Sequence, residues 1–127
     1  MLHLLLVGCG GFLGAIARYK LSELILHTSA QGCIPLGTLT VNVLGCLLVG
    51  LLAGAAERYA IFTVEARLFL FTGLLGGFTT FSAFGLEAMQ LIRRGDLVTA
   101  AIYASTSVIL ALAAVWLGFK LISLLPR

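Results

Sequence analysis

Four long hydrophobic segments follow one another along the chain, separated by short polar stretches. They run from Leu2 to Tyr19, Pro35 to Ala56, Leu68 to Ile92 and Leu97 to Leu125. Each is near or above the roughly 20 residues that a helix needs to cross a bilayer. The connections between them are too short to fold separately, the longest being Lys20–Ile34. We therefore predict an all-α membrane protein with a single four-helix transmembrane domain over residues 1–127.

Composition supports a membrane protein. Hydrophobic residues make up 61% of the chain and charged residues 10%, whereas soluble domains contain about 45–50% and about 25%. The first segment also resembles a signal peptide, because Ala15-Ile16-Ala17 is similar to a small-residue cleavage site. No Lys or Arg precedes that segment, and several glycines interrupt it. We therefore expect it to be retained in a multi-pass protein of the cell inner (plasma) membrane, with lipid and no nucleic acid as partner.

The positive charges are balanced between the two sides that four spans define. One side carries Arg58, Arg67, Lys120 and Arg127, and the other carries Arg18, Lys20, Arg93 and Arg94. Orientation normally follows an excess of Lys and Arg on the cytoplasmic side. A count of four against four gives no strong preference, so the chain is compatible with insertion in both directions. One fixed orientation stays open if a charge lies within the end of a span.

Glycines indicate close helix packing and one interrupted span. Three pairs have the Gly-x-x-x-Gly spacing that places both glycines on one helix face: Gly10 and Gly14, Gly50 and Gly54, and Gly73 and Gly77. They predict tight contacts within or between chains and favour oligomerisation. In the third segment, Gly76-Gly77 is followed by threonines and a serine, which weaken a helix where lipid offers no hydrogen bonds. We predict a break near Gly76–Thr80, buried in protein or lining a hydrated path.

Few polar side chains lie inside the segments, and Asn42 is the strongest candidate among them. Its amide offers two N–H donors that could hold an anion, although an interhelical hydrogen bond would also explain it. Thr38 lies one turn earlier, so both side chains can face the same way. Tyr103 and Ser107 share the same spacing in the fourth segment. Hydroxyl groups in helices commonly bond to their own backbone, so this second pair is weaker evidence.

Phenylalanines and hydroxyl residues alternate after the paired glycine. Phe78, Phe81 and Phe84 recur every three residues and would form one ridge of a helix, with Thr79 and Ser82 beside it. Such aromatic spacing usually reflects packing, but the positive edge of a phenyl ring can also face an anion. A bare anion in a low-dielectric interior carries a penalty on the order of 20 kcal/mol, so a selective path must replace its water with donors and ring edges.

Three motifs together resemble one known family. They are Gly10-Gly11-Phe12-Leu13-Gly14-Ala15 with Arg18-Tyr19, Gly37-Thr38-Leu39-Thr40-Val41-Asn42, and Gly76-Gly77-Phe78-Thr79-Thr80-Phe81-Ser82-Ala83-Phe84. In this order, the motifs are similar to those of the Fluc (CrcB) fluoride channels, and the resemblance covers essentially the whole chain. It implies a passive, fluoride-selective channel that exports fluoride from the cytoplasm and is not an enzyme.

The resemblance also implies an assembly and roles for individual residues. Members are antiparallel, dual-topology homodimers with two pores and one structural sodium ion on the two-fold axis. Carbonyl groups of Gly76 and Thr79 from both subunits would hold the sodium ion. Pore residues would be Asn42, Phe81, Phe84, Tyr103, Ser107, Ser82 and Thr38. Arg18 and Glu87 would lie at the pore entrance.

Two positions depart from the family pattern, and one other class of transporter stays open. Ala83 and Gly85 stand where family members often carry hydroxyl residues. The change affects the polar lining and hence the conduction rate more than the identity of the pore. The alternative is a dual-topology exporter of the small multidrug-resistance type, which would require an acidic residue deep in the first span. Leu2–Tyr19 contains none.

Overall fold

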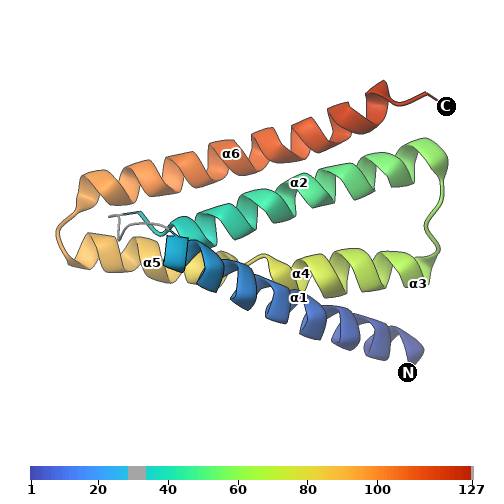
Figure 1. Ribbon diagram of the computed structural model, residues 1–127, viewed down its shortest axis with the longest axis horizontal. Helices are drawn as coiled ribbons and strands as arrows, with labels where there is room; N and C mark the ends of the chain where they lie inside the picture. The colour runs from blue at the N-terminus through green and yellow to red at the C-terminus, as the bar shows by residue number, and fades with distance from the viewer. Residues whose placement is uncertain (29–33, 127) are drawn as a thin grey trace.

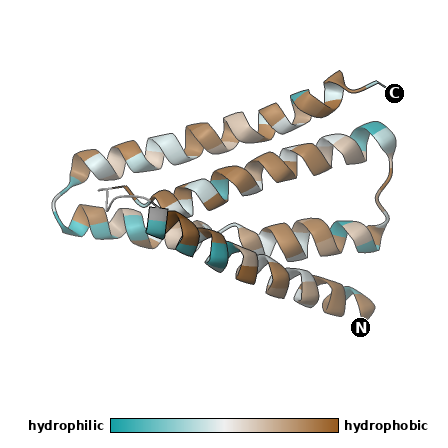
Figure 2. Ribbon diagram, in the orientation of Figure 1, coloured by the Kyte–Doolittle hydropathy of each residue, from teal (hydrophilic) through white to brown (hydrophobic). Residues whose placement is uncertain are grey.

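A computed structural model describes residues 1–28 and 34–126 as a bundle of long helices (Figure 1). Helix α1 comprises Leu2–Thr28, α2 Leu36–Tyr59 and α6 Leu97–Leu124. Between α2 and α6, the third span is built from α3 (Val64–Arg67), the π-helix η1 (Leu68–Leu75), α4 (Gly76–Phe78) and α5 (Phe81–Arg93). In the described part of the chain, four helical segments are long and apolar enough to span a membrane, as predicted. Hydrophobic residues dominate their middle stretches in Figure 2.

The first helix is longer than its hydrophobic segment. The sequence predicts a span ending at Tyr19 and a connection over Lys20–Ile34, but α1 continues to Thr28. That expectation is wrong, because residues 20–28 continue the helix. On the extra turns, Lys20 Nζ lies 3.1 Å from Glu23 Oε2, a pair whose spacing adds modestly to helix stability. Residues 29–33 of the predicted connection lie outside the described residues.

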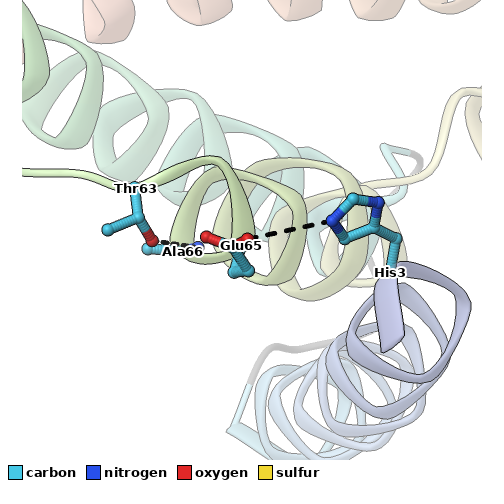
Figure 3. A network of polar contacts seen from close by, with 4 residues as sticks. All are labelled: His3, Thr63, Glu65 and Ala66. Atoms are coloured by element: carbon cyan, nitrogen blue, oxygen red, sulfur yellow. Dashed lines mark hydrogen bonds and ion pairs between the residues drawn. The ribbon is translucent and has the colours of Figure 1, made fainter. Parts of the chain in front are cut away.

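The start of the third span is fixed by a polar cap. The Thr63 hydroxyl accepts a hydrogen bond from the Ala66 N–H at 3.2 Å, which ends the short connection after α2 (Figure 3). In the same view, His3 Nε2 at the beginning of α1 lies 3.9 Å from Glu65 Oε1. These contacts place the start of α1 beside the start of the third span.

The bundle consists of two closely packed groups of helical segments, and α5 of the third span connects them. Helix α2 packs along α6, and α1 packs along η1 and α4, whereas α5 packs against α6. A Cβ added at Gly14 would collide with the Leu74 carbonyl, and one at Gly50 would collide with the Val115 carbonyl. The glycine pairs thus serve contacts within one chain, and they no longer argue for oligomerisation.

Few side chains are buried within the single chain. Val41 of α2 and Tyr103 of α6 are fully buried, while large side chains such as Phe81 and Trp116 are exposed. The core of the α5–α6 contact consists of Leu91, Ala100 and Tyr103. Much of the remaining apolar surface is therefore available to lipid or to another protein chain.

Candidate functional site

Two extended residues interrupt the third span. Thr79 has φ −83° and ψ 154°, and Thr80 has φ −147° and ψ 113°, so neither continues the helix that ends at Phe78. The hydroxyl of Thr80 then accepts the Ala83 N–H at 3.2 Å and caps α5. The break lies within the predicted range Gly76–Thr80, which confirms that prediction.

Asn42 of α2 bonds to the backbone of this break. Its Nδ2 donates to the Thr80 carbonyl at 3.0 Å, and its Oδ1 accepts the Thr80 N–H at 2.8 Å. The amide thus satisfies both polar backbone groups of a residue that has left the helix. This is the interhelical hydrogen bond that the sequence left open. Among the residues described, the second N–H of the amide has no protein acceptor.

A groove beside the break brings several predicted residues together. It has a volume of about 290 Å³ and lies between α2, the break, the start of α5, and α6. Its lining consists of Asn42, Cys46, Val49, Thr79, Thr80, Phe81, Phe84, Ser107, Val108 and Ala111. The Ser107 hydroxyl oxygen is buried and has no hydrogen-bond partner within residues 1–28 and 34–126. The groove therefore offers uncharged donors and aromatic side chains.

A hydrogen-bonded cluster of Thr38, Glu87 and Tyr103 lies outside the groove lining. Thr38 Oγ1 donates to Glu87 Oε1 at 2.6 Å, and the phenol of Tyr103 donates to Glu87 Oε2 at 2.7 Å. The Tyr103 ring also lies 5.2 Å from the Phe84 ring, and the Phe84 ring lies 5.5 Å from that of Phe81. Phe84 therefore connects the cluster with the groove. Tyr103 itself is fully buried, although it was expected to extend the polar lining alongside Ser107.

The remaining predicted residues take separate positions. Ser82 is exposed, and its hydroxyl lies 3.3 Å from that of Thr80. Arg18 is half-buried on α1, and its Nε has no hydrogen-bond partner in the described part of the chain. The predicted ridge through Phe78 does not form, because the extended residues separate Phe78 from α5. Its ring faces α2, where a Cβ added at Gly45 would lie 3.3 Å from Phe78 Cδ1.

Comparison with known proteins identifies the family. The family model described as CrcB-like protein, Camphor Resistance (CrcB), matches residues 5–119. The chain belongs to the CrcB-like family. A relative from Methylobacillus flagellatus is 47% identical over 98% of this chain and 97% of its own length. Others from Rhizobium etli and Nitratidesulfovibrio vulgaris are 45% and 42% identical, covering 95% and 93% of this chain and 96% and 94% of theirs.

Each of these CrcB-like relatives is named "Fluoride-specific ion channel FluC". The family is therefore one of ion channels, not enzymes, and the small multidrug exporter that the sequence left open is not supported. Together with four apolar helices, family membership identifies a multi-pass integral membrane protein of the plasma membrane.

Backbone carbonyl groups at the break of this CrcB-like chain suit a hard cation. In a continuous helix, Gly76 and Thr79 would accept from the N–H groups four residues later. Those N–H groups instead donate to Asn42 and to the Thr80 hydroxyl, and among the described residues no other backbone N–H outside the helices takes their place. Carbonyl oxygens without N–H partners are ligands that hard cations prefer. These residues therefore fit the predicted sodium site.

The sequence did not single out every residue of the site. Thr80 both bonds to Asn42 and caps α5, and Cys46 and Val49 continue the groove along α2. Cys46 and Val49 follow Asn42 by four and seven positions, which is the helical spacing of one face. That spacing could have identified them. The contact between Asn42 and Thr80 left no such signal.

Proposed function

We propose that this protein is a passive, fluoride-selective channel that exports fluoride from the cytoplasm. The observation that carries the proposal is the groove in which Asn42, Ser107, Phe81 and Phe84 meet. These residues combine uncharged hydrogen-bond donors with phenyl rings in a membrane-spanning part of the chain. Homologues with this family's sequence are named fluoride-specific channels, which supports fluoride as the ion.

Replacement of water around the anion is the chemical basis of the proposal. The free N–H of Asn42 and the unpartnered hydroxyl of Ser107 would donate to the ion, and the positive edges of Phe81 and Phe84 would face it. None of the described residues that line the groove carries a fixed positive charge. Individually weak ligands let an ion both enter and leave, which conduction requires.

An antiparallel homodimer would complete the pathway. Phe81 is 83% exposed on the single chain, so a second copy would have to cover it if its ring is to enclose an ion. A two-fold axis places the same surface of both copies at the interface and would give two pores per dimer. The even distribution of Lys and Arg permits the opposite orientations that this arrangement needs.

A structural sodium ion at the two-fold axis would be held by the carbonyl groups of Gly76 and Thr79 from both copies. Gly76 is exposed on the single chain, as a residue at such an axis must be. Bound there, the cation would compensate carbonyl groups that the broken helix leaves without N–H donors. In this arrangement, the residues around the break hold it open, so that the carbonyl oxygens of Gly76 and Thr79 could bind the ion.

The remaining candidate residues have supporting roles. Arg18 would raise the local concentration of anions near a pore entrance. Glu87, held by Thr38 and Tyr103, would lie at the entrance and fix the position of Phe84 through the Tyr103 ring. Ser82, beside Thr80 at the start of α5, would extend the polar side of the path.

The driving force requires no enzyme. In acidic surroundings, fluoride forms the neutral acid, which crosses the lipid unaided. The acid ionises in the more neutral cytoplasm, where the anion is trapped. With the cell interior negative, the membrane potential favours outward movement of an anion by about 2.3 kcal/mol per 100 mV. A passive pore therefore suffices to lower cytoplasmic fluoride.

A cellular experiment tests this function. The chain would be expressed in bacteria that lack their own fluoride exporters, with Phe81→Ile as the matched control. We expect wild-type protein to restore growth in fluoride medium and to lower cytoplasmic fluoride, and the variant to do neither. If wild-type protein reaches the membrane but leaves cytoplasmic fluoride unchanged, the proposed function is wrong.

A further inference from the structure

Two hydrogen bonds at the break redirect N–H groups away from the carbonyls that would bind a cation. In a continuous helix, the Thr80 N–H would donate to Gly76 and the Ala83 N–H to Thr79. Here Asn42 Oδ1 accepts the first N–H at 2.8 Å, and Thr80 Oγ1 accepts the second at 3.2 Å. The carbonyl groups of Gly76 and Thr79 thus each lose their helical N–H donor to one side-chain oxygen.

We infer that Asn42 and Thr80 are positioning residues that create the cation site without touching the cation. Asn42 frees the Gly76 carbonyl, and the Thr80 hydroxyl frees the Thr79 carbonyl. This inference rests on the proposed function, because it takes from it a sodium ion shared by two copies. It adds residues to that site and gives each a defined hydrogen bond.

The amide of Asn42 also connects the two proposed ion sites. Its Nδ2 donates to the Thr80 carbonyl at 3.0 Å, so the amide binds both the N–H and the carbonyl group of Thr80. The same side chain lines the groove beside Ser107. Loss of the Asn42 amide should therefore weaken cation binding as well as anion flux, whereas a residue that serves only the groove would change flux alone.

The design uses two independent losses and two controls. Asn42→Ala removes the acceptor of the Thr80 N–H, and Thr80→Ala removes the acceptor of the Ala83 N–H. Thr80→Ser keeps a hydroxyl at the cap and is the conservative control. Ser105→Ala removes a hydroxyl that bonds to its own helix, at the Ala101 carbonyl, and is the matched control away from the break.

The measurement is thermal unfolding of the full-length purified protein in lipid nanodiscs. Sodium chloride is titrated against choline chloride at constant ionic strength, and the sodium concentration at half-maximal stabilisation is determined. Loss of groups that orient metal ligands commonly weakens affinity by about 10–100-fold. We expect the midpoint to rise by about tenfold or more in Asn42→Ala and Thr80→Ala, and to stay at the wild-type value in Thr80→Ser and Ser105→Ala.

Three results overturn the inference: wild-type protein that sodium stabilises no more than choline does, wild-type midpoints in both alanine variants, or an equal loss in Thr80→Ser. If Asn42→Ala does not fold, the Thr80 pair decides the outcome. Failure of the proposed function is separate, because it would leave cytoplasmic fluoride unchanged whatever the sodium titration shows. A sodium midpoint that shifts as predicted in a protein without fluoride flux would support the cation site and contradict the channel.

Discussion

Tyr103 donates a hydrogen bond of 2.7 Å to Glu87 Oε2 while its ring packs against Phe84. The phenol is therefore both a partner of a half-buried carboxylate and a wall behind an aromatic residue of the groove. Thr38 holds the other carboxylate oxygen at 2.6 Å. Side chains from three segments, α2, α5 and α6, therefore meet at the Glu87 carboxylate.

Replacing Tyr103 with Phe keeps the ring and removes the hydrogen bond. Because one oxygen of a half-buried carboxylate then loses its donor, we expect the free energy of unfolding to fall by roughly 1.5–3 kcal/mol. Thermal or denaturant unfolding of the purified protein measures this. Tyr19→Phe, at an exposed position of α1, is the control. Equal stability of the two variants would mean that the Glu87 contact contributes nothing.

Phe81 and Phe84 should differ when each is replaced with Ile. Phe81 is 83% exposed on one chain, so Phe81→Ile should abolish most fluoride flux with little loss of stability in the single chain's fold. Phe84 packs against Tyr103 and the α5–α6 core, so Phe84→Ile should reduce both flux and stability. Liposome efflux and thermal unfolding separate the two effects. Undiminished flux in both variants would remove the aromatic side chains from the mechanism.

Gly14 should tolerate a side chain poorly, because the backbone of the third span lies directly against it. A Cβ at this position would meet the Leu74 carbonyl and lie 2.8 Å from the Phe78 nitrogen. We expect Gly14→Ala to lower the free energy of unfolding by about 1–3 kcal/mol. Gly8→Ala is the matched control on the same helix, since a Cβ at Gly8 would meet nothing within 4 Å. If both substitutions have the same effect, the close approach is not what Gly14 provides.

Hydropathy predicts the spans well and their ends poorly, because it does not report the hydrogen bonding at which a helix begins or ends. Hydropathy marks where lipid surrounds the chain, and this locates all four spans. Helices end where backbone hydrogen bonding ends, so α1 continues past Tyr19 into a polar stretch that includes the Lys20–Glu23 pair, and the third span starts at the Thr63 cap. Those polar signals are local and readable from sequence.

Contacts between distant residues could not be predicted in the same way. Asn42 and Thr80 are 38 positions apart, and their meeting depends on how α2 packs beside the break. The sequence identified Asn42 as an amide in need of partners, but not the partner. Likewise, it placed Tyr103 and Ser107 on one face of a helix, and only packing separates the buried phenol from the groove.

Charge balance should control whether the chain works alone. Neutralising Arg93 and Arg94 leaves two positive charges against four and should fix one orientation. We expect this variant to lose fluoride flux when expressed alone. Co-expression with a variant neutralised at Arg67 and Lys120, which has the opposite imbalance, should restore it. Accessibility labelling of the termini reports orientation, and full flux from a uniformly oriented single variant would contradict the antiparallel dimer.

Efflux from liposomes containing only this protein tests the central proposal most directly: uncharged donors and phenyl rings replace the water around fluoride. Fluoride and chloride release would be recorded with ion-selective electrodes after valinomycin addition to potassium-loaded vesicles. The predicted result is fast fluoride release with chloride release at the level of protein-free vesicles. Equal rates for both anions, or no fluoride release from correctly folded protein, would contradict it.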